Sequence, residues 1–92
     1  MSTLLVVNEK AKRKRSDAGV ELIFLPGGNF LFELNETASQ VLEHFRDPSL
    51  VNDVADVIAG DFEPEDASDI HSDICILVER FQQHGILVVA AP

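Results

Sequence analysis

The chain has few of the residues on which redox, metal and membrane functions depend. Its 92 residues include one cysteine, Cys75, and no tryptophan or tyrosine. A single cysteine excludes an internal disulfide and suits a reducing compartment. The longest strongly apolar run, residues 86–91, is far too short to cross a bilayer. Because the amino terminus also lacks the charged-then-apolar pattern of a secretion signal, we expect a cytoplasmic protein with no membrane partner.

Basic residues are scarce outside one short stretch. The net charge is −9, yet five of the seven lysines and arginines lie within residues 10–15. From residue 16 onward there are two arginines and fifteen acidic residues, so this part of the chain has a net charge of −13. A body this acidic repels nucleic acid phosphates and favours basic partners. Residues 8–19 end at Gly19 and have no apolar period, so they are predicted to form a mobile basic loop, with a nucleic-acid arm as the alternative.

Three segments rich in β-forming residues are predicted to be strands. They are residues 4–7, 20–25 and 30–34. The sequence Pro26-Gly27-Gly28-Asn29 between the last two has proline and glycine where a type II turn needs them. Two apolar runs around a short Pro/Gly turn predict a β-hairpin.

The third predicted strand is the candidate for an interaction edge. Period-2 alternation puts Phe30, Phe32 and Leu34 on one face, and Leu31 and Glu33 on the other. An open, apolar edge is a template for adding a strand from another chain, and it also allows two copies to pair as a homodimer. Phe32 and Leu34 are better explained as core residues, whereas for Leu31 and Glu33 contact with a partner stays open.

Three amphipathic helices are predicted after the hairpin. Asn35 is a favourable N-cap for the first, and Asp47-Pro48-Ser49 breaks it and opens the second. The second helix is expected to stop at Gly60. The third is expected to start near Asp66, with Asp69 completing a capping box, and to end at Gly85.

Each helix has one apolar stripe that should face the core. The stripes are Ala38, Val41, Leu42 and Phe45; Leu50, Val54, Val57 and Ile58; and Ile70, Ile74, Leu77, Val78 and Phe81. Residues 86–89 form an apolar tail that should pack back on the core. Strands followed by helices predict a single α+β domain over residues 1–92, with a three-stranded antiparallel sheet followed by three α-helices.

No combination of residues indicates catalysis. Cys75 lies in the middle of the third predicted helix, where a thiol is usually inert packing. His44, His71 and His84 are too widely spaced for a compact metal motif. Gly27 and Gly28 lie between two strands, so they do not form a phosphate-binding loop at the start of a helix. We therefore expect no catalytic residue, metal or cofactor, and a protein that is not an enzyme.

An ordered set of motifs resembles the PqqD family. Leu34-Asn35, followed by Ala38 and then Val41-Leu42, is similar to the family signature LN-x-x-A-x-x-(I/V)-L. Ser49-Leu50 resembles its Thr-Val entry to the second helix. Its closing pattern, D-V-x-x-(F/L)-(L/V) and then G-L-L, is matched by Asp73-Ile74, Leu77-Val78 and Gly85-Ile86-Leu87. The chain departs from the family at Asp47-Pro48, where Asp-Gly is common, and at the turn Phe24-Leu25-Pro26-Gly27, where the quinone-pathway member has Leu-Tyr-Pro-Glu-Gly.

The resemblance implies a winged-helix-like fold and a role as a peptide chaperone. Such a protein binds the leader of a ribosomally made precursor peptide and presents it to a modifying enzyme, often a radical SAM protein. The pathway, pyrroloquinoline quinone or another peptide product, stays open. The leader would add as a strand to residues 30–34 and lie against the third helix. The helix residues expected to contact it are Ile70, Asp73, Ile74, Leu77 and Arg80, with Asp73 facing a basic and Arg80 an acidic peptide residue.

Two other functions remain as alternatives. One is an acidic protein–protein adaptor that binds no leader peptide. The other is a winged-helix DNA-binding regulator, which the charge pattern disfavours. The third predicted helix carries Asp66, Asp69, Asp73 and Glu79 against the single Arg80, and a recognition helix needs donors aimed at bases in a phosphate-lined groove.

Overall fold

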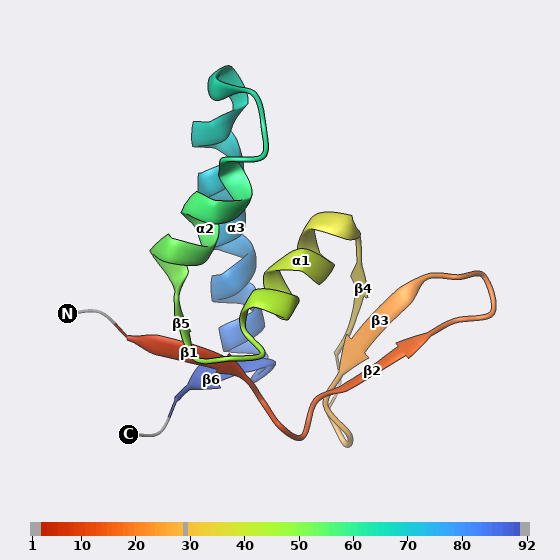
Figure 1. Cartoon of the computed structure of the whole chain (residues 1–92). Helices are drawn as coiled ribbons and strands as arrows, with labels where there is room; N and C mark the ends of the chain where they lie inside the picture. The colour runs from red at the N-terminus through yellow and green to blue at the C-terminus, as the bar shows by residue number, and fades with distance from the viewer. Residues whose placement is uncertain (1–2, 29, 91–92) are drawn as a thin grey trace.

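Two small antiparallel sheets and three helices make up the computed structural model, which describes residues 3–28 and 30–90 (Figure 1). The elements in chain order are β1 (Leu4–Val7), β2 (Lys12–Arg15), β3 (Glu21–Phe24), β4 (Leu31–Leu34), α1 (Glu36–His44), β5 (Ser49–Leu50), α2 (Val51–Ala59), α3 (Pro64–Gln83) and β6 (Leu87–Val89). The predicted α+β class is confirmed. The expected single three-stranded sheet is instead two three-stranded sheets, because three segments not predicted as strands also pair.

The first sheet joins the two ends of the chain. Its order is β5-β1-β6, and Leu5 lies opposite Val89 in the antiparallel β1–β6 pair. The apolar tail predicted to pack back on the core therefore does so as a strand. The peptide N–H of Val7 donates to the carbonyl of Phe45 at 2.9 Å, which ties this sheet to the end of α1. Ser49 and Leu50, expected to open the second helix, form β5 and pair with β1.

The second sheet has the order β2-β3-β4 and contains the predicted hairpin. In the turn, Gly27 has φ +81° and the N–H of Gly28 donates to the carbonyl of Leu25 at 2.9 Å. Proline at the second position and a positive φ at the third define the predicted type II turn. Asn29, the last residue of the expected turn, lies outside the described residues.

The prediction of a loop over residues 8–19 is wrong for Lys12–Arg15, which pair with β3 as strand β2. The strand has no apolar alternation. It is stabilised instead by ion pairs with acidic residues on β3 and α1. Arg13 forms a close ion pair with Glu21 and lies 3.6 Å from a carboxylate oxygen of Glu43 on α1. Arg15, directly opposite Glu21, lies 3.9 Å from it. Opposite charges on facing and diagonal positions stabilise a strand pair.

The Glu21 carboxylate is held in its charged form by this arrangement. The hydrogen bond from Arg13 lowers the pKa of Glu21 below its ordinary value of 4.5, against an opposing effect of partial burial. The charge of Arg13, a hydrogen bond from Ser39 and the charge of Arg15 act in the same direction as the Arg13 hydrogen bond. Glu21 therefore links β2, β3 and α1.

The first two helices follow the predicted pattern with one correction. The side chain of Asn35 accepts a hydrogen bond from the N–H of Ala38 at 2.8 Å, as an N-cap should. In α2, Val57 is 56% exposed, so its place in the predicted core stripe is wrong. Ala55 is buried instead. The two positions flank the buried Val54–Ile58 stripe on opposite sides, and the larger side chain was the misleading signal.

The third helix starts earlier than predicted. It begins at Pro64, with Glu63 as a cap residue that makes no side-chain hydrogen bond, so the capping box from Asp66 to Asp69 is absent. Proline is favoured in the first turn because no N–H is needed there and its φ is already helical. The expected start near Asp66 overlooked that preference.

The helix ends at Gly85 as predicted. Gly85 has φ +75°, its N–H donates to the carbonyl of Gln82 at 3.0 Å, and the N–H of Ile86 donates to Phe81 at 2.8 Å. These two bonds define a Schellman motif, which reverses the chain into β6. A Cβ atom on Gly85 would lie 3.0 Å from Cδ1 of Leu25, so this corner touches the β3–β4 turn.

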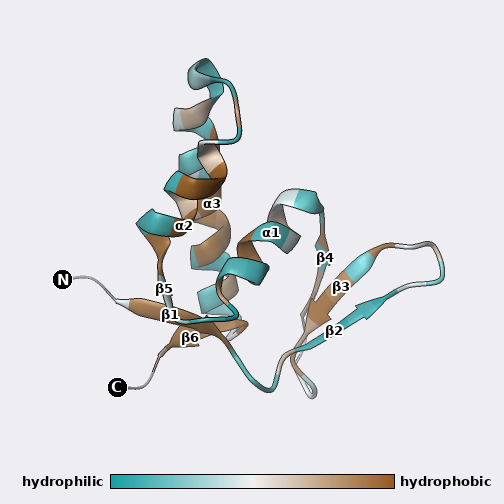
Figure 2. Ribbon diagram, viewed as in Figure 1, coloured by the Kyte–Doolittle hydropathy of each residue, from teal (hydrophilic) through white to brown (hydrophobic). Residues whose placement is uncertain are grey.

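One hydrophobic cluster joins both sheets to the three helices. Its fully buried large side chains include Leu5, Ile23, Phe45, Ile74 and Phe81. Figure 2 shows brown, apolar ribbon where α2 faces α3 and along β1, and teal, polar ribbon along β2. Across residues 3–28 and 30–90, no helix combines the length and apolar composition needed to cross a bilayer.

Candidate functional site

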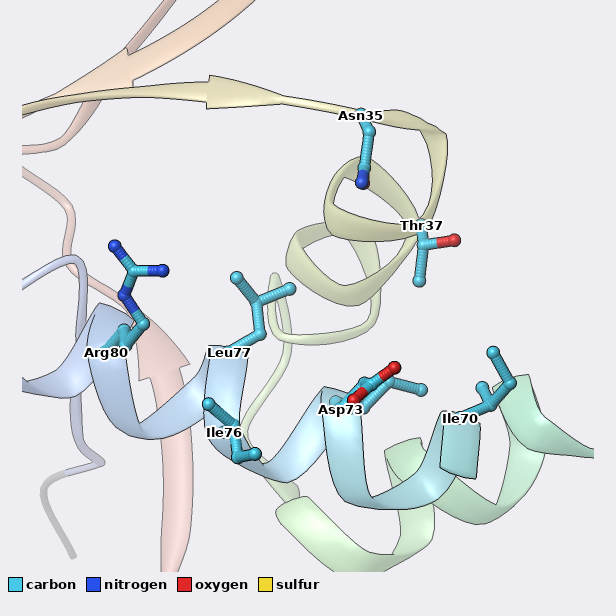
Figure 3. A pocket seen from close by; sticks show the side chains of 8 residues that line it. Asn35, Thr37, Ile70, Asp73, Ile76, Leu77 and Arg80 are labelled. Carbon is cyan, nitrogen blue, oxygen red and sulfur yellow. The ribbon is translucent and has the colours of Figure 1, made fainter. Parts of the chain in front are cut away.

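A cleft of about 350 Å³ lies between the start of α1 and the face of α3. Its lining residues are Asn35, Thr37, Ile70, Asp73, Ile74, Ile76, Leu77 and Arg80. Figure 3 shows Asn35 where β4 ends and Thr37 on α1, with the other labelled residues below them along α3. The side chains of Leu77 and Arg80 point from α3 toward the level of β4 and α1.

Helical periodicity explains why these α3 residues share a face. Positions 70, 73, 74, 77 and 80 repeat at three or four residues, which places them along one side of the helix. Ile74 is buried, and the half-buried Ile70 and Leu77 pack against the core cluster from the cleft side. The floor of the cleft is thus apolar and fixed by the core.

Two opposite charges mark the cleft. Asp73 and Arg80 both line it and both are exposed. Among residues 3–28 and 30–90, neither takes part in an ion pair. Both charges are available to a ligand that lies along the helix.

Strand β4 is an open edge beside this cleft. Within the described residues it pairs only with β3. Ser16 N–H donates to the carbonyl of Val20 at 2.8 Å, and in an antiparallel ladder hydrogen-bonded and non-hydrogen-bonded pairs alternate. Counting along β2 and β3 from that pair, Phe32 and Leu34 bond toward β3. Leu31 and Glu33 therefore direct their backbone N–H and C=O groups to the free edge.

The inner face of β4 is held against the end of α3 by aromatic contacts. The ring of Phe32 lies 5.2 Å from that of Phe81 in an edge-on arrangement, and Phe30 lies 4.0 Å from the ring of His84. These contacts join the start of β4 to the end of α3, whereas Asn35 at the end of β4 lines the cleft with Ile70. The strand and the helix therefore run in opposite directions.

The predicted site residues divide into two groups. All five predicted on the third helix, Ile70, Asp73, Ile74, Leu77 and Arg80, line the cleft. None of the five predicted on the strand does. Leu34 is buried and Phe32 is half-buried, while Phe30, Leu31 and Glu33 are exposed. The strand residues thus provide the open edge and the aromatic packing against α3, and the helix residues line the cleft.

Three lining residues were not predicted as site residues. Ile76 is 58% exposed, and its position off the predicted core stripe was a signal that an apolar side chain points outward. Asn35 was recognised only as a helix cap. Thr37 has no sequence signal, since its place depends on how α1 sits over α3.

A polar contact away from the cleft joins α2 to α3. Nε2 of His71 lies 3.1 Å from Oδ1 of Asp56, and Nδ1 of His71 lies 3.8 Å from Sγ of Cys75. None of these three residues lines the cleft. The contact fastens the two helices together on the side of α3 that packs on α2. Nowhere in residues 3–28 and 30–90 do three or more His, Cys, Asp or Glu side chains gather in a group that could hold a metal ion.

Comparisons with known proteins find a matching family by sequence and a similar solved structure by fold. Residues 22–87 match the family described as "PqqD: Coenzyme PQQ synthesis protein D (PqqD)". A search of curated proteins finds no match. The fold is similar to a solved structure described as "Lasso peptide synthetase B1 complexed with the leader peptide", with a TM-score of 0.69 and 21% sequence identity. The similarity covers 91% of this chain and 96% of that one, and at this identity it shows a shared fold.

Proposed function

The chain belongs to the PqqD family, and from that premise we propose that it is a peptide chaperone, a single domain that binds the leader segment of a ribosomally made precursor peptide. The leader adds as a strand to β4 and lays side chains into the cleft along α3. The protein then presents the precursor to a modifying enzyme, for which a radical SAM protein is the proposed partner. It does no chemistry of its own in this scheme.

The observation that carries this proposal is the open edge of β4 beside the α3 cleft. Leu31 and Glu33 offer unpaired backbone groups on that edge, and Leu31 is 54% exposed. Strand addition uses such groups for affinity and adjoining pockets for specificity. The solved structure of similar fold is described as a complex with a leader peptide, which supports the same class of ligand here.

An NMR titration tests the proposal directly. The probes are synthetic peptides that cover the amino-terminal halves of the short open reading frames next to this gene. We expect one of them to bind with a Kd of about 0.1–10 μM, because ordering a flexible peptide offsets part of the contact energy. Amide shifts should cover β4 and residues Ile70–Arg80.

The site is misplaced if the shifts are confined to β2 or to α2. If no such peptide binds while an unrelated folded protein does, the acidic adaptor function replaces this one. The enzyme partner is tested separately, by the rate at which a radical SAM enzyme encoded nearby modifies its precursor. That rate should rise when this protein is added, and it should not rise with a variant that cannot bind the leader.

A further inference from the structure

The charges of the cleft define a sequence pattern for its ligand. Resting on the proposed function, we propose that the cleft selects an extended peptide that carries a basic, an apolar and an acidic residue at alternate positions, in that order from amino to carboxyl end. The basic residue faces Asp73, the apolar residue covers Leu77, and the acidic residue faces Arg80. The ligand class is thus narrower than any apolar strand.

The spacing follows from helix and strand geometry. Asp73 and Leu77 are four residues apart on α3, which is about 6 Å along the helix axis. Two residues of an extended peptide span about 6.6 Å, so side chains at i and i+2 reach both. Arg80 lies about 10.5 Å from Asp73 along the same axis. The side chain at i+4, about 13 Å along the peptide, lies within reach of the long and exposed Arg80 side chain.

The direction follows from the way β4 runs. Strand β4 starts beside His84, at the end of α3, and ends at Asn35, beside Ile70. Its sheet is antiparallel throughout, and an antiparallel addition continues that ladder with the more stable hydrogen-bond pattern. A peptide added in this way runs from Asp73 toward Arg80. Its basic residue therefore precedes its acidic residue.

The two charges act on register and direction more than on total affinity. Exposed opposite charges contribute modestly to binding, but they penalise a peptide that binds with its charges reversed. The β4 backbone favours one direction but accepts many sequences, and the apolar floor does not distinguish one register from another. Asp73 and Arg80 fix the register and the order of charges within that direction.

A selection from random peptides tests the pattern. A library of 12-residue random peptides, linked to their coding RNA, is selected on the wild-type protein and on the double variant Asp73→Lys/Arg80→Glu. Wild type should enrich a basic–apolar–acidic order at positions i, i+2 and i+4, and the double variant should enrich the reverse order. For one selected peptide, exchanging its two charges should weaken binding to wild type about threefold to tenfold and restore binding to the double variant.

The variant Glu79→Lys is the matched control. Glu79 is an exposed acid on the same helix that does not line the cleft, so it should keep the wild-type preference. Peptides enriched without any charge order, or in the same order on wild type and double variant, overturn the pattern and leave the peptide-binding function standing. If no peptide is enriched on the wild-type protein, both the pattern and the proposed function are wrong.

Discussion

The two edges of the β2-β3-β4 sheet differ in the way they meet solvent. At the β2 edge all four strand residues are basic and exposed. The arginines form ion pairs within the part of the chain that the structure describes, and the lysines that alternate with them do not. Arg13 and Arg15 pair with Glu21, whereas Lys12 and Lys14 make no ion pair with any described residue. At the β4 edge the sequence is Leu-Phe-Glu-Leu, with a 54% exposed leucine at its start.

This difference supports the proposal that β4 is the binding edge. An open edge invites pairing with other chains, and natural proteins commonly blunt it with lysine and other charges. The β2 edge is blunted in this way, and charge repulsion opposes the approach of a second copy's β2. The β4 edge carries one acid and is otherwise apolar. The protection of one edge and the apolar character of the other support the proposal that a partner strand adds to β4.

The largest expected effect concerns the support of the β4 edge. Phe81 is fully buried and its ring packs edge-on against that of Phe32. Phe81→Ala should therefore lower the free energy of unfolding by about 3–5 kcal/mol. Ile76→Ala, on the exposed rim of the cleft, should change it by less than about 0.5 kcal/mol. Chemical denaturation measures both. Equal effects would show that the edge does not rest on the aromatic contact.

The next effect compares the edges directly. Glu33→Pro removes an N–H from the free edge of β4, so leader peptide affinity should fall about tenfold, or about 1.4 kcal/mol. Arg15→Pro makes the same change on the free edge of β2 and should leave affinity within about twofold. Calorimetric titration gives both constants, with Glu33→Gln and Arg15→Gln correcting for the lost charges. An equal loss from both prolines would contradict the assignment of β4 as the binding edge.

A smaller effect is expected at the junction of β4 and α1. Asn35 caps α1 through its bond to the N–H of Ala38, so Asn35→Ala should cost about 1 kcal/mol of stability. Gln40→Ala on the exposed side of α1 is the control, with no expected loss. Thermal unfolding followed by circular dichroism distinguishes them. A stable Asn35→Ala variant would mean that water replaces the cap at no cost.

The smallest effect concerns the protected edge. Because the pKa of Glu21 is lowered in the folded state, its charge stabilises the fold above its ordinary value of 4.5. That contribution is lost as the pH falls through 4.5 toward the folded pKa. Glu21→Gln should therefore be less stable than the wild type at pH 7, and the difference should shrink as the pH is lowered below 4.5, when urea unfolding is followed across this pH range. Protection of the β2 amides from exchange, relative to the intrinsic rate at each pH, should fall in acid for the wild type more than for Glu21→Gln.

Sequence patterns predicted the parts of this fold that local periodicity determines. The α1 cap at Asn35, the stripe of α3 and the β3–β4 hairpin each follow from neighbouring residues. The cleft residues Ile70 to Arg80 were found because one helix carries them all. Strand β2 was missed because its own residues show no apolar alternation, and its stabilising ion pairs with Glu21 and Glu43 leave no periodic signal in the sequence.

Other features depend on tertiary contacts that no local pattern reports. The pairing of β1 with β6 joins segments far apart in the sequence, so neither strand by itself indicates the β5-β1-β6 sheet. In α2 both Ala55 and Val57 fit a helical stripe, and only the position of α3 decides between them. The contribution of Thr37 to the cleft depends in the same way on the placement of α1 over α3.

The Schellman corner at Gly85 has a consequence for the width of the cleft. Because Cδ1 of Leu25 occupies the space into which a side chain at position 85 would extend, the β3–β4 turn rests directly on the glycine. The distance between the β3–β4 hairpin and the end of α3 is therefore set partly by a residue that does not line the cleft. In the proposed binding mode, a change at this corner or at the turn would alter the room beside β4 and leave the proposed contact residues unchanged. The size of ligand that fits would then depend on residues outside the proposed contact surface.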